Sequence, residues 1–306
     1  MKLLRYCATF RSLVALMFLA SFLFPSPTAS SRAKNTKASA GEPVVILDVR
    51  QNAGTIYISP VALFERGQFN PPFSKINGEL PRRRFVEKYF SAGRKYHLIF
   101  GGGDAGALTI TNGYWQDGSY AYGELAPVAA AGGRIKGQLH AVATNSETIA
   151  RPAIWRRSPT AEERTAAIGL AKEAFLQNKT PATALSKMEV INLTAIDVDG
   201  DDKAELVGTF KAPQARADKP PHWLFLIAEA DSQGDYAATK VNYQFSPEQT
   251  QYPVGEELLV DYLDLDGDGT SEVVTSFTVR DYLEIFEIYQ RKNARWLQVF
   301  TGGGSH

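Results

Sequence analysis

The stretch Asp264-Leu-Asp266-Gly-Asp268-Gly269-Thr-Ser-Glu272 places acidic side chains at positions 1, 3, 5 and 9 of one short loop. A loop with this spacing can wrap carboxylate oxygens around one hard cation. The same four positions are acidic in a second stretch, Asp197-Val-Asp199-Gly-Asp201-Asp202-Lys-Ala-Glu205. Because the pattern occurs twice, the sequence predicts two metal-binding loops. The predicted ligands are Asp197, Asp199, Asp201 and Glu205 in the first loop and Asp264, Asp266, Asp268 and Glu272 in the second.

Calcium is the metal that these ligand types favour. It binds through oxygen, whereas Mg²⁺ usually retains several waters and Zn²⁺ prefers His and Cys, which neither loop contains. The alternative is that each stretch is a solvated hairpin turn without an ion. The second loop is expected to be the better site, because its sharp bend falls on Gly269. The first loop has Asp202 there, and aspartate tolerates left-handed dihedral angles less well.

The residues that follow the loops indicate strands rather than the helices of an EF-hand. An EF-hand loop has a glutamate at position 12, where this chain has Gly208 and Thr275. Residues 273–279 alternate and are rich in β-branched side chains, which is typical of a strand. Each loop is therefore predicted to join two strands.

A longer repeated unit is visible when the two loops are superposed. Leu193 then aligns with Val260, and Phe210 aligns with Phe277. After each loop the chain continues into two further predicted strands, at 222–229 and 236–245 in the first copy and at 282–290 and 295–300 in the second. A unit of four strands and roughly 60 to 70 residues has the size of a blade-like meander.

This repeated unit resembles the FG-GAP/VCBS-type calcium repeat, known from the propeller of integrin α chains and from many secreted bacterial proteins. The resemblance covers about residues 190–300. It implies that the acidic positions named above hold calcium, with a backbone carbonyl near position 7, and that the protein serves in binding or adhesion. A propeller has typically four or more blades, and two copies are readable here, so a closed propeller is not predicted.

The N-terminal segment has the three parts of a secretory signal. Basic residues precede an apolar run at 13–24, and small residues follow it, with cleavage expected between Ala29 and Ala33. The run is shorter than the about 20 residues that span a bilayer, and an uncleaved membrane anchor is the alternative. Residues 1–33 are therefore predicted to be a signal peptide of a protein exported to the periplasm or the medium. The single cysteine, Cys7, would leave with it, so disulfides are not expected.

The remaining chain predicts a mainly β fold. Hairpin signals occur at 51–54 and at Asp117-Gly118. An antiparallel β domain should be followed by a second antiparallel β repeat domain with one packed α-helix, an α+β arrangement. The predicted divisions are a linker at 34–42, the N-terminal β domain at 43–150, and the helix with two calcium-loop repeats at 151–306.

The clearest helix signal lies between the two halves. Ser158-Pro159 is one candidate N-cap, and Thr160 with Glu163 forms an alternative capping box. An apolar stripe of alanine, leucine and phenylalanine follows over about four turns. This helix is expected to cover one face of the sheet made by the two repeats. A shorter helix is expected at 84–92.

Two other motifs fail tests of their context. The glycines Gly101, Gly103 and Gly106 match the spacing of a dinucleotide fingerprint, but the fingerprint requires a helix next and this chain continues as a strand. A glycine-rich β turn is predicted instead. Tyr120 and Tyr122 point to one face of a predicted hairpin, where aromatic side chains more often pack a core than stack on sugars.

The residue types of acid-base catalysis are scattered along the chain. Glu284 and Glu287 lie three apart on a predicted strand and so should point to opposite faces, which discounts them as a catalytic pair. No histidine pair has metal-binding spacing on a helix, and each histidine is expected to be structural or exposed. The histidines are His97, His140, His222 and His306.

These observations predict an exported, non-catalytic calcium-binding protein whose partner is an extracellular protein or a carbohydrate. Basic and acidic residues number 33 each, so no overall field attracts nucleic acid. Membrane contact is expected only through the signal segment, if it is uncleaved. The alternative is a secreted hydrolase of polysaccharide or peptide in which calcium braces the fold. A cleft in which histidine and carboxylate side chains converge would favour the hydrolase.

Overall fold

The computed structural model describes residues 42–52, 55–72, 79–116, 120–125, 140–147, 156–214, 219–245, 254–279 and 283–305. All of them belong to one compact unit, residues 40–306. The fold is mainly β, as predicted, with three antiparallel sheets and three helices in the described ranges. Within these ranges, no helix is both long enough and apolar enough to span a bilayer. The predicted signal peptide, residues 34–41 of the predicted linker and His306 lie outside them.

A seven-stranded sheet is formed by residues 44–144, with the strand order β1-β7-β4-β5-β6-β2-β3. Both predicted hairpins are present, because β1 pairs with β2 and β5 pairs with β6. The turn residues Asp117 and Gly118 and the side chains of Tyr120 and Tyr122 lie outside the described residues. The strands are β1 (Val44–Asn52), β2 (Thr55–Glu65), β3 (Gln68–Asn70), β4 (Lys95–Phe100), β5 (Gly103–Gln116), β6 (Tyr120–Leu125) and β7 (His140–Thr144).

Two four-stranded antiparallel sheets follow, and in both of them consecutive strands are neighbours. The first sheet comprises β8 (Glu189–Ile196), β9 (Glu205–Ala212), β10 (His222–Ala230) and β11 (Tyr236–Gln244). The second comprises β12 (Val254–Leu263), β13 (Glu272–Val279), β14 (Leu283–Lys292) and β15 (Arg295–Ser305). Each acidic loop joins the first two strands of its sheet, as predicted. The two copies do not share one sheet, however, so the expectation that the helix covers a common sheet is wrong.

The helices are α1 (Glu79–Tyr89), α2 (Ala161–Gln177) and the short α3 (Ala182–Leu185). Of the two candidate caps for α2, the structure has the capping box. The Glu163 N–H donates to Thr160 Oγ1 at 3.2 Å, and the Thr160 N–H donates to Glu163 Oε2 at 2.7 Å. A hydrogen bond from Arg157 lowers the pKa of Glu163 to about 2. The helix expected at 84–92 is α1, which begins five residues earlier.

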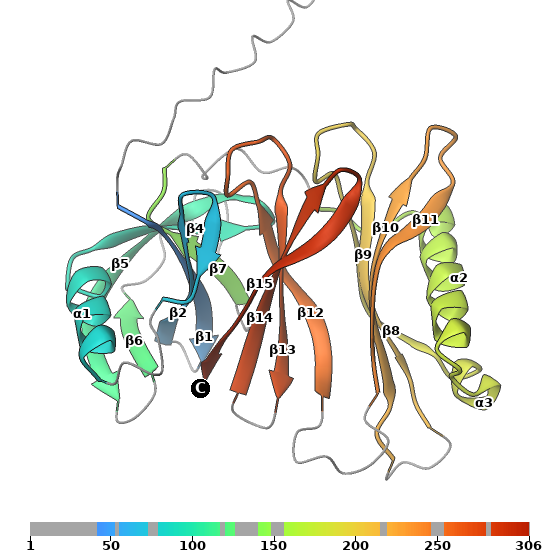
Figure 1. The fold of residues 1–306 in the computed structure, drawn as a ribbon, viewed down its shortest axis with the longest axis horizontal. Helices are drawn as coiled ribbons and strands as arrows, with labels where there is room; N and C mark the ends of the chain where they lie inside the picture. Colours follow the sequence, from blue (N-terminus) through green and yellow to red (C-terminus); the bar gives the residue numbers. More distant parts are fainter. Residues whose placement is uncertain are drawn as a thin grey trace, which may run out of the picture. The chain divides into compact units, whose positions relative to one another are not determined.

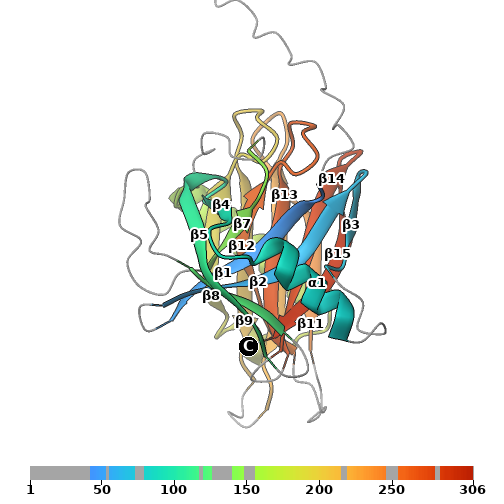
Figure 2. The same cartoon turned by 90° about the vertical axis from the view of Figure 1, so that its left-hand side faces the viewer.

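The sheets are stacked face to face, with a helix at each end of the stack (Figure 1). Helix α1 packs on one face of the seven-stranded sheet through Phe85 and Tyr89, and Figure 2 shows it in front of that sheet. The other face packs against the second four-stranded sheet. That sheet in turn packs against the first four-stranded sheet, whose outer face is covered by α2. The second four-stranded sheet therefore has protein on both faces.

A glycine turn fixes the seven-stranded sheet to β12. Gly101 and Gly102 form the turn between β4 and β5, and their N–H groups donate to the Asp261 carboxylate at 3.1 and 2.8 Å. The Tyr262 hydroxyl donates to the Gly101 carbonyl at 2.7 Å. A Cβ on Gly102 would lie 2.2 Å from the Tyr262 ring. Of the glycines in the apparent dinucleotide motif, Gly101 lies in this turn and Gly103 and Gly106 lie in β5, so the segment is a glycine-rich β turn, as predicted. The position that needs glycine for its contact with Tyr262 is Gly102.

Replacing Asp261 should weaken this junction measurably. Asp261 is fully buried, and Asp261→Ala leaves the N–H groups of two partly buried glycines without their acceptor, where a fully buried group would cost about 1–3 kcal/mol. We expect a loss of about 2–4 kcal/mol in the free energy of unfolding by urea. Asp104→Ala, an exposed aspartate of the same hairpin, is the control and should cost under about 1 kcal/mol. Equal stabilities of the two variants would contradict this account.

Candidate metal centres

The first acidic loop folds around the side chain of Asp197. Asp197 Oδ1 accepts hydrogen bonds from the N–H groups of Gly200 and Asp201 at 2.7 and 3.2 Å, and Oδ2 accepts one from Asp202 at 3.1 Å. At the end of the loop, Glu205 Oε2 accepts the Val198 N–H at 2.8 Å. A short acidic turn therefore closes on itself through backbone donors.

The second loop repeats this arrangement. Asp264 accepts the N–H groups of Gly267 and Gly269 at 2.7 and 3.1 Å. Glu272 Oε2 accepts the Leu265 N–H at 2.7 Å, as Glu205 does in the first loop. The backbone at the sharp bend is left-handed in both loops, with φ of +97° at Gly269 and +66° in the first loop at Asp202. The bend thus has the geometry that the sequence predicted, and Asp202 adopts it at a higher conformational cost.

Each loop brings three of its four predicted ligands together. One side-chain oxygen from each of Asp197, Asp199 and Glu205 lies within 4.8 Å of the other two, and the same holds for Asp264, Asp266 and Asp268. The two remaining acids have other neighbours. Asp201 accepts the N–H of Lys203, and Glu272 accepts the Gln290 amide.

Burial and mutual repulsion act against ionisation of the inner acids. Burial raises the pKa of Glu205 to about 8, and the charge on Asp199 adds to the rise. Burial likewise raises the pKa of Glu272 to about 8, with a further contribution from Asp266. One oxygen of Asp199, Oδ1, is shielded from solvent and has no hydrogen-bond partner. These acids would be stabilised in their charged form by a nearby cation.

The two loops lie against each other. The Ser271 N–H of the second loop donates to the Val198 carbonyl of the first at 2.7 Å. Val198 and Leu265, at position 2 of their loops, are buried in the cores on opposite faces of the second four-stranded sheet. The loops are therefore held by apolar anchors between their acidic positions.

Strand β14 contacts both loops from adjacent residues. Gln290 donates its amide to Asp266 Oδ2 at 2.7 Å and to Glu272 Oε1 at 2.8 Å, both in the second loop. Arg291 Nη1 lies 3.1 Å from Asp199 Oδ2 in the first loop. The same guanidinium binds Glu229 of β10 through two hydrogen bonds of 2.9 Å. The first loop thus already has a tethered cation beside it, and the second has a neutral amide.

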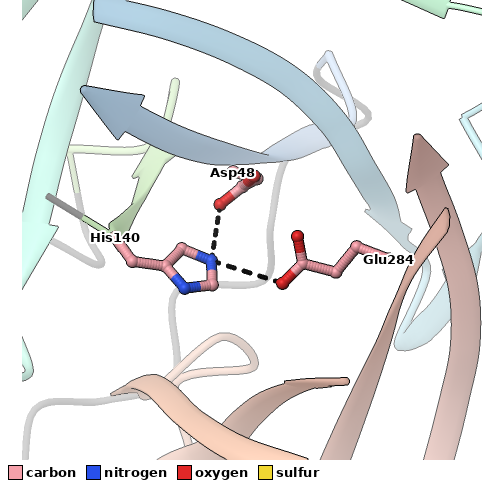
Figure 3. Close-up of side chains that lie close together, drawn as sticks. All are labelled: Asp48, His140 and Glu284. Carbon is pink, nitrogen blue, oxygen red and sulfur yellow. Dashed lines mark ion pairs between the residues drawn. The ribbon is translucent and has the colours of Figure 1, made fainter. Parts of the chain in front are cut away.

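A third cluster combines residues from three strands and two sheets (Figure 3). Asp48 of β1 and Glu284 of β14 are buried, and His140 of β7 is partly exposed. His140 Nε2 lies 2.8 Å from Asp48 Oδ1 and 3.9 Å from Glu284 Oε1. Arg50 pairs with the outer oxygens of both carboxylates, at 2.8 Å from Asp48 Oδ2. Burial raises the pKa of Asp48, but His140 and Arg50 outweigh it, so the pKa lies below its ordinary value.

The sequence did not predict this third cluster, because its members are separated by 92 and 144 residues and lie on strands with no shared motif. One signal was available. Asp48 interrupts an otherwise apolar run in β1, and a charged residue in a buried strand requires a partner. The other described histidines lie elsewhere, with His97 3.5 Å from Asp104 and His222 2.7 Å from the Tyr243 hydroxyl.

A fourth polar cluster lies between the two four-stranded sheets. The Tyr289 hydroxyl is hydrogen-bonded to Glu257 Oε1 at 2.9 Å and also to Glu287. Asn242 of β11 and Thr275 donate to Glu257, each at 2.8 Å. Burial and repulsion by Glu287 raise the pKa of Glu257 to about 7. Glu284 and Glu287 do face opposite sides of β14, as predicted, because Glu284 contacts Arg50 of the seven-stranded sheet and Glu287 belongs to this cluster.

Comparisons with known proteins found no match for this chain. No family model matches the chain, and no curated protein and no solved structure matches it.

The raised pKa of Glu257 makes stability depend on pH. Its folded pKa of about 7 exceeds the ordinary value of 4.5, so folding favours the protonated carboxyl. Its contribution is greatest below about pH 4.5 and is lost as the pH rises towards about 7. The test is the change in unfolding free energy when the pH is raised from 5 to 8 in saturating calcium. This loss should be roughly 1–3 kcal/mol larger for the unsubstituted protein than for Glu257→Gln. The exposed Glu162→Gln is the control, and superimposable pH profiles for the protein and Glu257→Gln would show that Glu257 is already ionised when folded.

Proposed function

We propose that the chain is an exported, non-catalytic calcium-binding protein whose two acidic loops each hold one calcium ion. The observation that carries the proposal is that both loops fold through equivalent backbone contacts and each gathers three acids, at positions 1, 3 and 9 in the first loop and 1, 3 and 5 in the second. In each, the first aspartate accepts backbone N–H groups, the ninth-position glutamate closes the loop, and three acidic oxygens lie within 4.8 Å of one another. A structural ion would offset repulsion among these acids.

Calcium fits these donors better than other common metals. All the donors in the loops are oxygens, and Ca²⁺ accepts six to eight oxygens in flexible geometry, at about 2.3–2.6 Å. Export would place the loops where calcium is plentiful, and extracellular calcium modules bind it with dissociation constants of about 0.1–1 mM. The FG-GAP/VCBS resemblance supports the same ion and suggests binding or adhesion, to an extracellular protein or a carbohydrate.

The position of the loops suggests what the ions do. The loops are hydrogen-bonded to each other through Ser271 and Val198, and Arg291 joins the first loop to β14. Each loop also connects the first two strands of its sheet. Calcium is therefore proposed to hold the register of these strands and the contact between the two sheets, and its removal should reduce stability or partner binding.

Calcium titration tests this function directly. We expect titration calorimetry to detect two sites and the melting temperature to rise with calcium, because a ligand that binds only the folded state stabilises it. Asp264→Ala should abolish the tighter site and Asp197→Ala the weaker one. Calorimetry without heat, together with melting unchanged by chelator, would exclude the proposal.

Arg291 provides a second test of the ranking. Its guanidinium lies 3.1 Å from Asp199 and should oppose a second cation in the first loop. Arg291→Gln should therefore strengthen the weaker site and leave the tighter one unchanged, whereas Arg295→Gln, an exposed arginine on β15, should alter neither. If Asp197→Ala removed the tighter site, the ranking of the loops would be reversed.

The second candidate function is a secreted hydrolase with structural calcium. One observation favours it, namely that His140 converges with two buried carboxylates, Asp48 and Glu284. General acid-base catalysis uses these residue types. Since we propose a non-catalytic protein, a screen of chromogenic glycosides, esters and peptides should be blank. Turnover abolished by His140→Ala, with the fold intact by circular dichroism, would favour the hydrolase.

A further inference from the structure

The cluster of Asp48, His140 and Glu284 is separate from the acidic loops and offers a different set of donors. It lies where the seven-stranded sheet meets the second four-stranded sheet. Arg50 and His140 are direct cross-strand neighbours on β1 and β7, and Glu284 reaches them from β14. The ring of Phe286 packs edge-on against the His140 ring at 6.2 Å. Each residue is thus carried by a paired strand in a packed interface.

The three inner atoms are arranged like the ligands of one small cation. Zinc–ligand bonds of about 2.0–2.2 Å put neighbouring ligand atoms roughly 3.0–3.5 Å apart. Here Nε2 lies 2.8 Å from Asp48 Oδ1 and 3.9 Å from Glu284 Oε1, and all three atoms lie within 4.8 Å of one another. The two distances from Nε2 lie within a few tenths of an ångström of this range.

Asp48 supplies an independent indication that something is bound. Its side chain is 1% exposed, and its Oδ1 atom has no hydrogen-bond partner although it lies 2.8 Å from His140 Nε2. The contact lacks the alignment of a hydrogen bond. Two ligands of one metal ion can lie close together without being aligned for a hydrogen bond, because each ligand atom points at the ion and not at the other ligand. A buried carboxylate oxygen that accepts no hydrogen bond is costly, and a cation at this position would offset that cost.

Arg50 contacts all three residues of the cluster and orients its two carboxylates. Arg50 Nη2 lies 3.3 Å from His140 Nε2, so the guanidinium and both carboxylates gather around this ring nitrogen. A metal ion binds an imidazole through a deprotonated ring nitrogen. Arg50 also binds Asp48 Oδ2 and Glu284 Oε2, which leaves Oδ1 and Oε1 towards the histidine. Hydrogen bonds to the outer oxygens orient ligating carboxylates in known metal sites.

We propose that Asp48, His140 and Glu284 bind one Zn²⁺ ion. One imidazole and two carboxylates are donors that zinc accepts, and calcium prefers oxygen alone. Two carboxylates and one guanidinium leave one negative charge for the cation to offset. His140 is 29% exposed, which gives the ion a route from solvent. Three protein ligands leave one coordination position for water. The ion would join the seven-stranded sheet to the second four-stranded sheet.

Zinc uptake by the purified protein tests this site. The protein is stripped with chelator, saturated with calcium to fill the acidic loops, equilibrated with Zn²⁺ and analysed for bound metal after gel filtration. We expect one zinc per chain, retained in His97→Ala, whose histidine has one carboxylate beside it, and lost in His140→Ala. Equal zinc in the protein and in His140→Ala would overturn the proposal. In that case the cluster is an ion-pair network in which Arg50 is the cation.

Cobalt gives a readout that needs no substitution, should His140→Ala fail to fold. With calcium saturating the loops, Co²⁺ added to the protein should produce visible absorption distinct from that of the hydrated ion, and an equivalent of Zn²⁺ should remove it. A spectrum identical to that of hydrated Co²⁺ would equally overturn the site. Because calcium stoichiometry is measured separately by calorimetry, failure of the zinc site and failure of the calcium loops are distinguishable.

Discussion

The second four-stranded sheet has protein packed against both faces, and this constraint governs the charged residues on its strands. A buried carboxylate must find hydrogen-bond donors or a positive charge, or else remain protonated. Asp261 uses the backbone N–H groups of the glycine turn, and Glu284 uses Arg50. Glu257 and Glu287 instead share the hydroxyl of Tyr289. That hydroxyl has one proton to donate, so one carboxyl must supply a proton of its own, in keeping with the raised pKa of Glu257.

The polar contacts of this sheet also decide which elements it joins. Asp261 and Glu284 connect it to the seven-stranded sheet, whereas Glu257 and Arg291 connect it to the first four-stranded sheet. Apolar packing alone would allow the sheets to slide or rotate, because it is not directional. Hydrogen bonds with fixed partners restrict that freedom. The stacking order therefore depends on a few buried polar residues as well as on the apolar cores.

Local features of the sequence predicted the parts of the fold that depend on neighbouring residues. The strands after each acidic loop, the capping box at Thr160 and the bend at Gly269 follow from alternation, side-chain hydrogen bonding and backbone freedom within a few positions. The contacts across sheets could not be predicted in this way. His140 meets Glu284 because two faces pack together, and no short segment encodes that pairing. The same limit explains why the two repeats were expected in one sheet.

The difference between the acidic loops illustrates how one strand can serve both. Because Val273 pairs with Tyr289 and the equivalent Leu206 pairs with Ala228, Gln290 occupies the position that Glu229 has in the first copy. Gln290 donates its amide to the acids of the second loop. Glu229 cannot donate to the acids of the first loop and instead accepts hydrogen bonds from Arg291. Successive residues of a strand point to opposite faces. Gln290 and Arg291 therefore reach their respective loops only in one register of β14. A slip of one residue would move Arg291 to the position of Gln290, or Gln290 to the position of Arg291, and each loop would lose its present partner.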